Sequence, residues 1–276
     1  MKPLEKDLKF ARYILDDTED CFDTLDSDRL YLRSNEPLEF IFSQFDFSSK
    51  DILLVLASSD QVFSFYQDGA NSVDTFDIHR LTEYYYYLRL WCLREYQNSF
   101  PYEFSNSSLK QVLSFTFPDF PEGVQAKKFW STLLTEYPGL MRSSMFFSPM
   151  SASTAPFEGK EESLLVDVPD YPLSFREQDF FSSFDSNRQY DVCFMSNVLE
   201  YARGNEHKLM IARDNLDRVL KSGGIVIVTR FMDLSSQTKE KERRIFSSSF
   251  EYYPGRKRSC EGFSEGLDSY YVYRKK

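Results

Sequence analysis

Polar residues follow two short apolar segments of this sequence at a spacing that suits recognition of a nucleoside. Residues 52–57 read Ile-Leu-Leu-Val-Leu-Ala, and the run Ala57-Ser58-Ser59-Asp60-Gln61 begins at their end. Asp77 closes the next apolar segment and stands twenty positions after Ala57. An acid at this spacing accepts hydrogen bonds from ribose hydroxyls in nucleoside-binding folds. The two features together predict a site for the sugar of a nucleoside-like ligand.

Two further polar clusters follow later apolar segments. Asp179 closes the segment 172–179, and its carboxylate is suited to accept a hydrogen bond from an adenine amino group. Ser196-Asn197 ends the segment that starts at Tyr190, and Glu200-Tyr201 come next. An Asp after a strand often only caps the next helix, so each acid also has this purely structural interpretation. The ordered set of four clusters favours a ligand site.

The segments that must position these clusters have the patterns of buried strands separated by amphipathic helices. A short continuous apolar run is typical of a buried parallel strand and occurs at 52–57, and further strands are predicted at 72–78, 172–179, 190–196 and 225–229. Strands that alternate with helices predict an α/β fold, here a Rossmann-like, doubly wound, mostly parallel sheet with helices on both faces. In such sheets ligands bind beyond the carboxyl ends of the strands, which is where the polar clusters stand.

Apolar residues at three- and four-residue steps predict helices over 81–92 and 206–220. The run Tyr84–Tyr87 in the first of these is expected to lie half in the core and half at the surface. Lys221-Ser222-Gly223-Gly224 is a glycine signal that predicts the end of the second helix. The alternating residues 270–273 predict an edge or hairpin strand.

Three parts of the chain are expected. Residues 1–49 form a helical segment that covers the cofactor site, and residues 50–97 and 162–276 form the Rossmann-like domain. Residues 98–161, rich in Phe, Pro and Ser, interrupt the alternation of strands and helices and are predicted to be a helical insertion.

Composition excludes several classes of function. A net charge of −10 argues against a surface that attracts nucleic acid as a whole. The four cysteines are scattered, which favours buried structural thiols, and two histidines argue against a His-built zinc site, so we expect no metal. The first residues lack the apolar region of a signal peptide, and no apolar run reaches the length of a membrane span, so we expect a cytoplasmic protein.

Five stretches of the chain carry a resemblance to a known family: Tyr31–Glu36, Leu54–Gln61, Val73–Ile78, Met141–Phe146 and Phe194–Tyr201. Through them the chain resembles the class I S-adenosylmethionine-dependent methyltransferase superfamily. Within it, the chain is most similar to the branch of betaine-lipid-type 3-amino-3-carboxypropyltransferases and its uncharacterised bacterial relatives. The resemblance implies S-adenosylmethionine as cofactor and a small-molecule or lipid-like acceptor.

The resemblance also implies roles for individual residues. Asp77 would hold the ribose, Asp179-Phe180 the adenine, and Ser34-Asn35-Glu36 one wall of the cofactor site. The remaining candidate residues at the cofactor are Ala57, Ser58, Ser59, Asp60, Ile78 and Ser196, and those at the acceptor are Asn197, Glu200 and Tyr201.

The chain departs from this family in the first turn, because relatives place glycines where it has Ala57 and Ser59. Glycine permits positive φ and close approach of the backbone to a ligand. Either the turn relaxes and the cofactor still binds, or the cofactor has been lost.

Three functions therefore stay open. The chain is a transferase of a methyl or 3-amino-3-carboxypropyl group, or a non-catalytic relative that binds a nucleoside-like ligand or a protein partner. The third function is peripheral action on a lipid or nucleic-acid surface through the basic residues 239–244 and 256–258. Glu residues alternate within the first basic tract, which favours a solvated helix face there. The sequence gives no oligomeric state.

Overall fold

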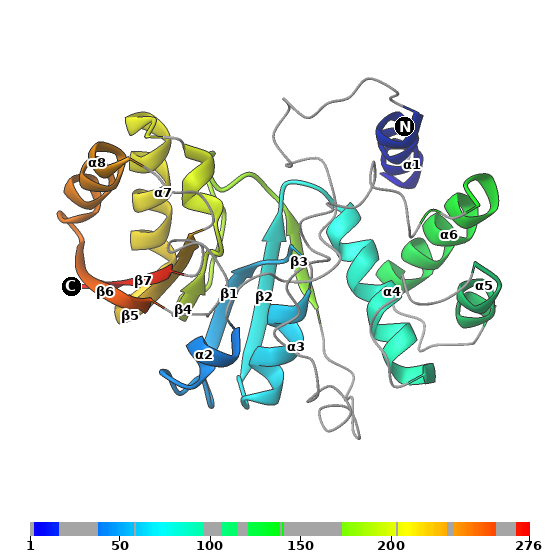
Figure 1. The fold of residues 1–276 in the computed structure, drawn as a ribbon, viewed down its shortest axis with the longest axis horizontal. Helices are drawn as coiled ribbons and strands as arrows, with labels where there is room; N and C mark the ends of the chain where they lie inside the picture. Colours follow the sequence, from blue (N-terminus) through cyan, green and yellow to red (C-terminus); the bar gives the residue numbers. More distant parts are fainter. Residues whose placement is uncertain are drawn as a thin grey trace. The chain divides into compact units, whose positions relative to one another are not determined.

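The computed structural model describes residues 3–16, 38–57, 59–96, 106–114, 121–138, 140, 173–202, 204–230, 235–257 and 269–276. The chain divides into two compact units. One unit contains four helices and the short segment Leu56–Asp60, and the other contains a seven-stranded sheet with its own helices (Figure 1).

The sheet has the strand order β3-β2-β1-β4-β5-β7-β6. The five strands β3, β2, β1, β4 and β5 pair in parallel, whereas β7 runs antiparallel to both β5 and β6. The strands are β1 Asp51–Val55, β2 Ser72–Asp77, β3 Ser174–Glu177, β4 Tyr190–Phe194, β5 Leu220–Arg230, β6 Phe250–Lys257 and β7 Ser269–Lys275. The prediction of a doubly wound, mostly parallel sheet is confirmed.

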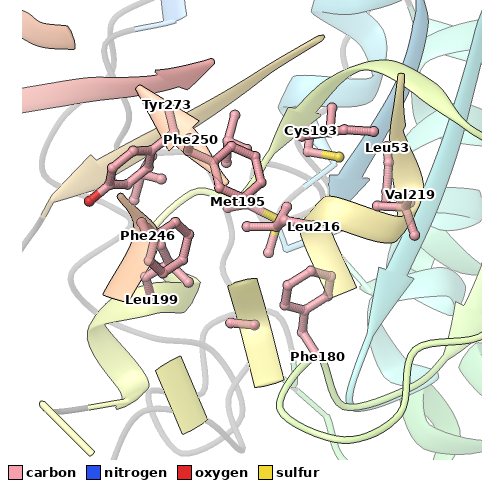
Figure 2. Packing of buried hydrophobic residues seen from close by; sticks show 14 of the residues in the cluster. Leu53, Phe180, Cys193, Met195, Leu199, Leu216, Val219, Phe246, Phe250 and Tyr273 are labelled. Carbon is pink, nitrogen blue, oxygen red and sulfur yellow. The ribbon is translucent and has the colours of Figure 1, made fainter. Parts of the chain in front are cut away.

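Helices cover both faces of this sheet because successive strand residues point to opposite sides. Leu53 of β1 and Cys193 of β4 belong to a buried cluster with α7 (Glu206–Val219) and α8 (Ser236–Phe246), and Figure 2 shows this packing. The neighbouring Phe194 meets Phe65 of α3 (Asp60–Gln67), with 5.6 Å between the ring centroids. The sheet unit also holds α2 (Leu38–Phe42) and the 3₁₀ helix η7 (Val198–Ala202).

The helix predicted at 206–220 ends one residue earlier than expected, and the glycine signal predicted for its end lies in a strand instead. Leu220 is already extended, with φ −88° and ψ 140°, so α7 ends at Val219 and the two glycines lie inside β5. Gly223 adopts φ +75°, and a Cβ on Gly224 would stand 3.0 Å from the carbonyl oxygen of Asp191. The glycines therefore serve the close pairing of β5 with β4 rather than the end of a helix.

Residues 270–273 pair as a hairpin with β6, as predicted, but they do not form an edge. β7 lies between β5 and β6, and Tyr271 and Tyr273 are buried. Their hydroxyls donate to the buried carboxylate of Glu242 on α8, at 2.6 and 3.0 Å. These bonds fix α8 on the antiparallel end of the sheet.

The helical unit contains α1 (Pro3–Asp16), α4 (Leu81–Tyr96), α5 (Asn106–Ser114) and α6 (Pro121–Glu136). All four tyrosines of the run 84–87 are buried, so the expectation that half of them lie at the surface is wrong. The indole N–H of Trp130 donates to the carbonyl oxygen of Tyr84 at 2.7 Å, and the Tyr84 hydroxyl donates to Asp7 at 2.8 Å. The apolar stripe of α4 is thus only part of a buried surface that extends around the helix.

The two units differ from the predicted domains in where α4 belongs. The sequence analysis assigned residues 50–97 to the sheet domain, whereas α4 contacts α5 and α6 and clusters with them. The segment 1–49 is also divided, because α1 lies in the helical unit and α2 in the sheet unit.

A charged cluster joins the amino ends of the central strands. Lys221 binds Asp51 at 3.0 Å and Asp191 at 2.9 Å, and Arg188 binds Asp51 at 2.6 Å. Partial burial alone would raise the pKa of Asp51, but hydrogen bonds from Asn71 and Lys221 and the charge of Arg188 hold it well below its ordinary value. Desolvation alone would raise the pKa of Asp191, but the hydrogen bond and charge of Lys221 and the hydrogen bond from the Asp51 N–H together lower it.

This cluster predicts a loss of stability in acid. A carboxyl group with a depressed pKa stabilises the fold above its unfolded pKa of about 3.9 and loses that contribution as the pH falls through its folded pKa. Asp51→Asn should therefore lower the free energy of unfolding by about 1–2 kcal/mol at pH 7 and by less at pH 2.5, which lies between the unfolded and the folded pKa. Urea denaturation at both pH values measures the difference. Asp185→Asn, at an exposed acid, is the control, and an equal loss at both pH values for Asp51→Asn would contradict the prediction.

Candidate functional site

The turn between β1 and α3 keeps the backbone conformation that glycine favours. Ala57 has φ +43° and Ser59 has φ +76°, although both carry a Cβ. The Ser59 N–H donates to the carbonyl oxygen of Leu56 at 2.8 Å, which closes the turn. Of the two alternatives considered for this turn, cofactor binding and loss of the cofactor, both stay open. Ser58 lies outside the described residues.

Strain in this turn predicts that a glycine will stabilise the protein. The left-handed region costs an L-residue about 1–2 kcal/mol. Glycine removes this cost, but it also increases the conformational entropy of the unfolded chain, which offsets part of the gain. Ala57→Gly should therefore raise the free energy of unfolding by about 0.5–1 kcal/mol, or the melting temperature by about 2 °C. Ala70→Gly is the matched control, because Ala70 is not among the positive-φ residues and the same change there should destabilise. A lower melting temperature for Ala57→Gly would contradict the assignment of strain.

Asp60, the first residue of α3, is engaged by a buried ion pair. Its Oδ1 lies 2.6 Å from Nη2 of Arg89 on α4, and the two side chains are 8% and 1% exposed. The sequence analysis missed Arg89, although a single arginine between Leu88 and Leu90 in a largely apolar helix was a visible signal. A carboxylate that binds a guanidinium this closely has its charge balanced within the helical unit.

Asp77 and Ile78 stand at the carboxyl end of β2. Asp77 is half-buried, and its carbonyl oxygen accepts from the Gln178 N–H at 2.7 Å, which ties the ends of β2 and β3 together. Ile78 is 42% exposed, so this apolar side chain lies outside the core. An acid beside an exposed apolar side chain is suited to a ligand with a sugar and a flat base.

Asp179 has a structural role, because it caps the turn after β3. Its Oδ1 accepts from the Phe181 N–H at 2.8 Å, and its carbonyl oxygen accepts from Ser182, so it caps the turn after β3. The side chain is otherwise exposed. The ring of Phe180 is buried and stacks on Phe76, with 5.1 Å between centroids, so this ring belongs to the core.

The segment after β4 forms a second left-handed turn. Ser196 is buried with φ +47°, and its carbonyl oxygen accepts from the Thr229 N–H at 3.0 Å. Nothing in the sequence marks this conformation, since serine has no preference for it. Asn197 follows, and its carbonyl oxygen accepts from the Glu200 N–H at 2.9 Å in η7. Glu200 is buried, whereas Asn197 and Tyr201 are half-buried.

The sheet unit thus brings Asp77, Asp179 and Ser196–Tyr201 to one edge, because β2, β3 and β4 are parallel and end together. The candidates Ser34–Glu36 and the stretch Met141–Phe146 lie outside the described residues. Within the described part of the chain no group of three His, Cys, Asp or Glu could hold a metal ion. Burial raises the pKa of the Cys92 thiol to about 12, so this thiol is protonated at neutral pH.

No protein-family model and no curated protein matches this chain. Among solved structures, the magnesium protoporphyrin IX methyltransferase ChlM from Synechocystis PCC 6803, with bound S-adenosylmethionine, is 10% identical with TM-score 0.42, over 100% of this chain and 85% of that one. The N-methyltransferase NodS from Bradyrhizobium japonicum WM9, in complex with S-adenosylhomocysteine, is 11% identical with TM-score 0.40, over 99% and 96%. A TehB-like S-adenosylmethionine-dependent methyltransferase from Corynebacterium glutamicum is 11% identical with TM-score 0.42, over 88% and 89%. These neighbours are class I methyltransferases, and similarity at this level concerns the arrangement of strands and helices alone.

Proposed function

We propose that this chain binds S-adenosylmethionine and transfers a methyl or 3-amino-3-carboxypropyl group to a small-molecule or lipid-like acceptor. One observation carries the proposal: the turn after β1 keeps positive φ at Ala57 and Ser59 although neither is glycine. Strained backbone of this kind is found most often at ligand sites and active sites, which supports a ligand at this turn. Asp77 then follows at the end of the neighbouring strand, as a nucleoside site requires.

The residues present fit this cofactor. Asp77 offers carboxylate oxygens to the two ribose hydroxyls, and the exposed Ile78 offers an apolar surface to the adenine ring. Asp179 has one carboxylate oxygen in its turn and the second available in an exposed side chain for the exocyclic amine. Ser59 adds a buried hydroxyl that has no hydrogen-bond partner among the described residues.

Asn197, Glu200 and Tyr201 are proposed to position the acceptor. The cofactor supplies an activated sulfonium carbon, so the protein needs no nucleophile of its own and acts by orientation. Asn197 and Tyr201 are half-buried and present an amide and a phenol near the end of β4. Glu200 is buried in η7, from where its carboxylate would accept the proton that an amine or hydroxyl acceptor releases.

The charge distribution favours an acceptor that is not nucleic acid. The net charge is −10, and two basic residues of α8 pair with an acid of α7. Arg244 binds Glu206 at 3.0 Å and Lys241 lies 3.5 Å from the same carboxylate. No helix in the described ranges is long and apolar enough to cross a membrane. The net charge and these ion pairs support a small or lipid-like acceptor over nucleic acid.

Calorimetric titration of the purified chain with S-adenosylhomocysteine, the product of methyl transfer, tests the cofactor assignment. We expect saturable binding with a Kd in the micromolar range. Absence of heat at millimolar ligand, from protein that melts cooperatively, would overturn the proposal and favour the non-catalytic alternative. Titration with 5′-methylthioadenosine, the product of aminocarboxypropyl transfer, in the same series compares the two reactions.

A further inference from the structure

Asn215 is a polar residue on the buried face of α7. It is 2% exposed, and the other buried residues of this helix are apolar, namely Leu209, Ala212, Leu216 and Val219. Asparagine is a poor helix former, and an amide in an apolar site costs free energy unless it is hydrogen-bonded. An apolar side chain would suit this face better, so the amide has a reason of its own.

The amide of Asn215 holds the loop between β3 and β4. Its Nδ2 donates to the carbonyl oxygens of Phe180 and Ser182, at 2.8 Å each. Its Oδ1 accepts from the Phe184 N–H at 3.3 Å and from Nη2 of Arg218 at 2.5 Å. Because the nitrogen faces two acceptors and the oxygen faces two donors, the orientation of the amide is determined.

One peptide group of this loop connects Asn215 to Asp179. The group between Phe180 and Phe181 carries the carbonyl that accepts from Asn215, and also the N–H that donates to Oδ1 of Asp179 at 2.8 Å. A trans peptide group is planar, with its C=O and N–H pointing in opposite directions. Asn215 therefore fixes the direction from which the Asp179 carboxylate is bonded, and successive hydrogen bonds of this kind strengthen one another.

The packing of the loop does not fix this direction by itself. The rings of Phe180 and Phe184 belong to the buried cluster, where Phe180 lies below α7 (Figure 2) and stacks on Phe76 at 5.1 Å. Burial of these rings holds the loop against the sheet, but apolar contacts are not directional and leave the next peptide group free to turn. The hydrogen bonds of Asn215 supply the direction that the rings do not.

We propose that Asn215 is a positioning residue for the recognition of adenine. Through the peptide group between Phe180 and Phe181, it holds the Asp179 carboxylate so that the second carboxylate oxygen accepts from the exocyclic amine. The inference rests on the proposed function and adds to it the residue of α7 that maintains selectivity for adenine over a purine without the amino group.

The test compares two ligands that differ only in the exocyclic amine. These are S-adenosylhomocysteine and its deamino analogue, in which purine replaces adenine. In calorimetric titration the original chain should prefer S-adenosylhomocysteine about tenfold, as expected for a hydrogen bond to a charged group. Asn215→Asp keeps the volume and one acceptor oxygen, but it turns a second oxygen toward the two carbonyls. The preference should then fall below about threefold, with the affinity for the analogue unchanged.

Two further variants serve as controls. Asn187→Asp makes the same chemical change at an exposed asparagine of the same loop and should keep the preference of the original chain. Asp179→Ala shows the preference that remains without the carboxylate. Asn215→Asp combined with Asp179→Ala should match Asp179→Ala alone, because the effect of Asn215 on selectivity passes through Asp179. Thermal melting shows which variants keep the fold.

Nuclear magnetic resonance of the original chain gives a readout that needs no variant. The amide proton of Phe181 and the side-chain amide protons of Asn215 lie in the same chain of hydrogen bonds as Asp179. They should shift on addition of S-adenosylhomocysteine and much less on addition of the analogue, since the two ligands have the same ring system.

The outcomes separate this inference from the proposed function. If the original chain binds neither ligand, the proposed function fails and the inference fails with it. If it binds both equally well, the cofactor assignment stands and the inference is overturned. A preference that Asn215→Asp keeps, or an equal loss of affinity for both ligands, also overturns it, since Asn215 would then only support the fold. If Asn215→Asp does not melt cooperatively, the resonance comparison decides, and identical shifts with the two ligands overturn the inference.

Discussion

Asp77→Asn is expected to weaken the binding of S-adenosylhomocysteine about 100-fold. The ribose presents two adjacent hydroxyls, and a carboxylate accepts from both with charge-assisted hydrogen bonds. The amide keeps one acceptor oxygen and turns a donor toward the second hydroxyl, so one bond is lost and the other loses its charge. Two such changes of about 1.5 kcal/mol each correspond to this factor. Calorimetric titration measures it directly.

The control for Asp77→Asn is the same chemical change elsewhere in the sheet unit. Asp214 lies on α7, with its side chain 63% exposed, and Asp214→Asn should leave the affinity unchanged. Circular dichroism and thermal melting of both variants show whether the fold is kept. An affinity of Asp77→Asn within threefold of that of the original chain would remove the ribose role from Asp77 and with it the main polar contact of the proposed site.

The sheet could be predicted from the sequence because its central strands are short continuous apolar runs. Residues 52–57 overlap β1 and residues 190–196 contain β4, and the central residues of β1 are buried on both faces. A run of this kind has few alternatives in a chain of alternating strands and helices. The glycines at 223–224 were misassigned because glycine is used both after helices and where two strands approach closely. Only the tertiary position of Asp191 distinguishes the two uses.

The candidate site was predicted less completely, for reasons specific to each residue. The position of Asp77 at the end of β2 could be predicted from spacing alone, since the lengths of β1, α3 and β2 together set it. Whether Asp179 caps a turn or contacts a ligand depends on hydrogen bonds from Phe181 and Ser182, which no pattern of residue types encodes. The left-handed conformations of Ser59 and Ser196 are equally hidden, because serine carries no signal for positive φ. In physical terms, sequence patterns report burial and period, and they do not report strain.

Strain is also what links the fold to the proposed function. Ala57 and Ser59 stand two residues apart at positive φ in the turn after β1, and Ser49 and Ser196 adopt positive φ elsewhere in the sheet unit. Selection for stability alone would favour glycine at Ala57 and Ser59. Glycines at these two positions are what the resemblance implies, and this turn is where the chain departs from it.

Arg89→Met is expected to lower the free energy of unfolding by about 3–5 kcal/mol, the largest effect on stability that we predict. The change removes the guanidinium that lies 2.6 Å from Asp60 and leaves the Asp60 carboxylate in a site where it is 8% exposed. A buried charge without its partner costs this much because water does not reach it. Methionine itself is tolerated, because its flexible apolar side chain fills much of the volume that arginine occupied. Urea denaturation of both proteins at pH 7 measures the difference.

An exposed ion pair of the same unit provides the comparison that isolates burial. Arg12 binds Glu136 at 2.8 Å with side chains 41% and 37% exposed, so Arg12→Met should cost no more than about 1 kcal/mol. The double variant Asp60→Asn with Arg89→Met should recover part of the loss, because an amide in place of the carboxylate leaves no buried charge. Equal losses for Arg12→Met and Arg89→Met, or no recovery in the double variant, would show that packing around Arg89 matters more than its charge.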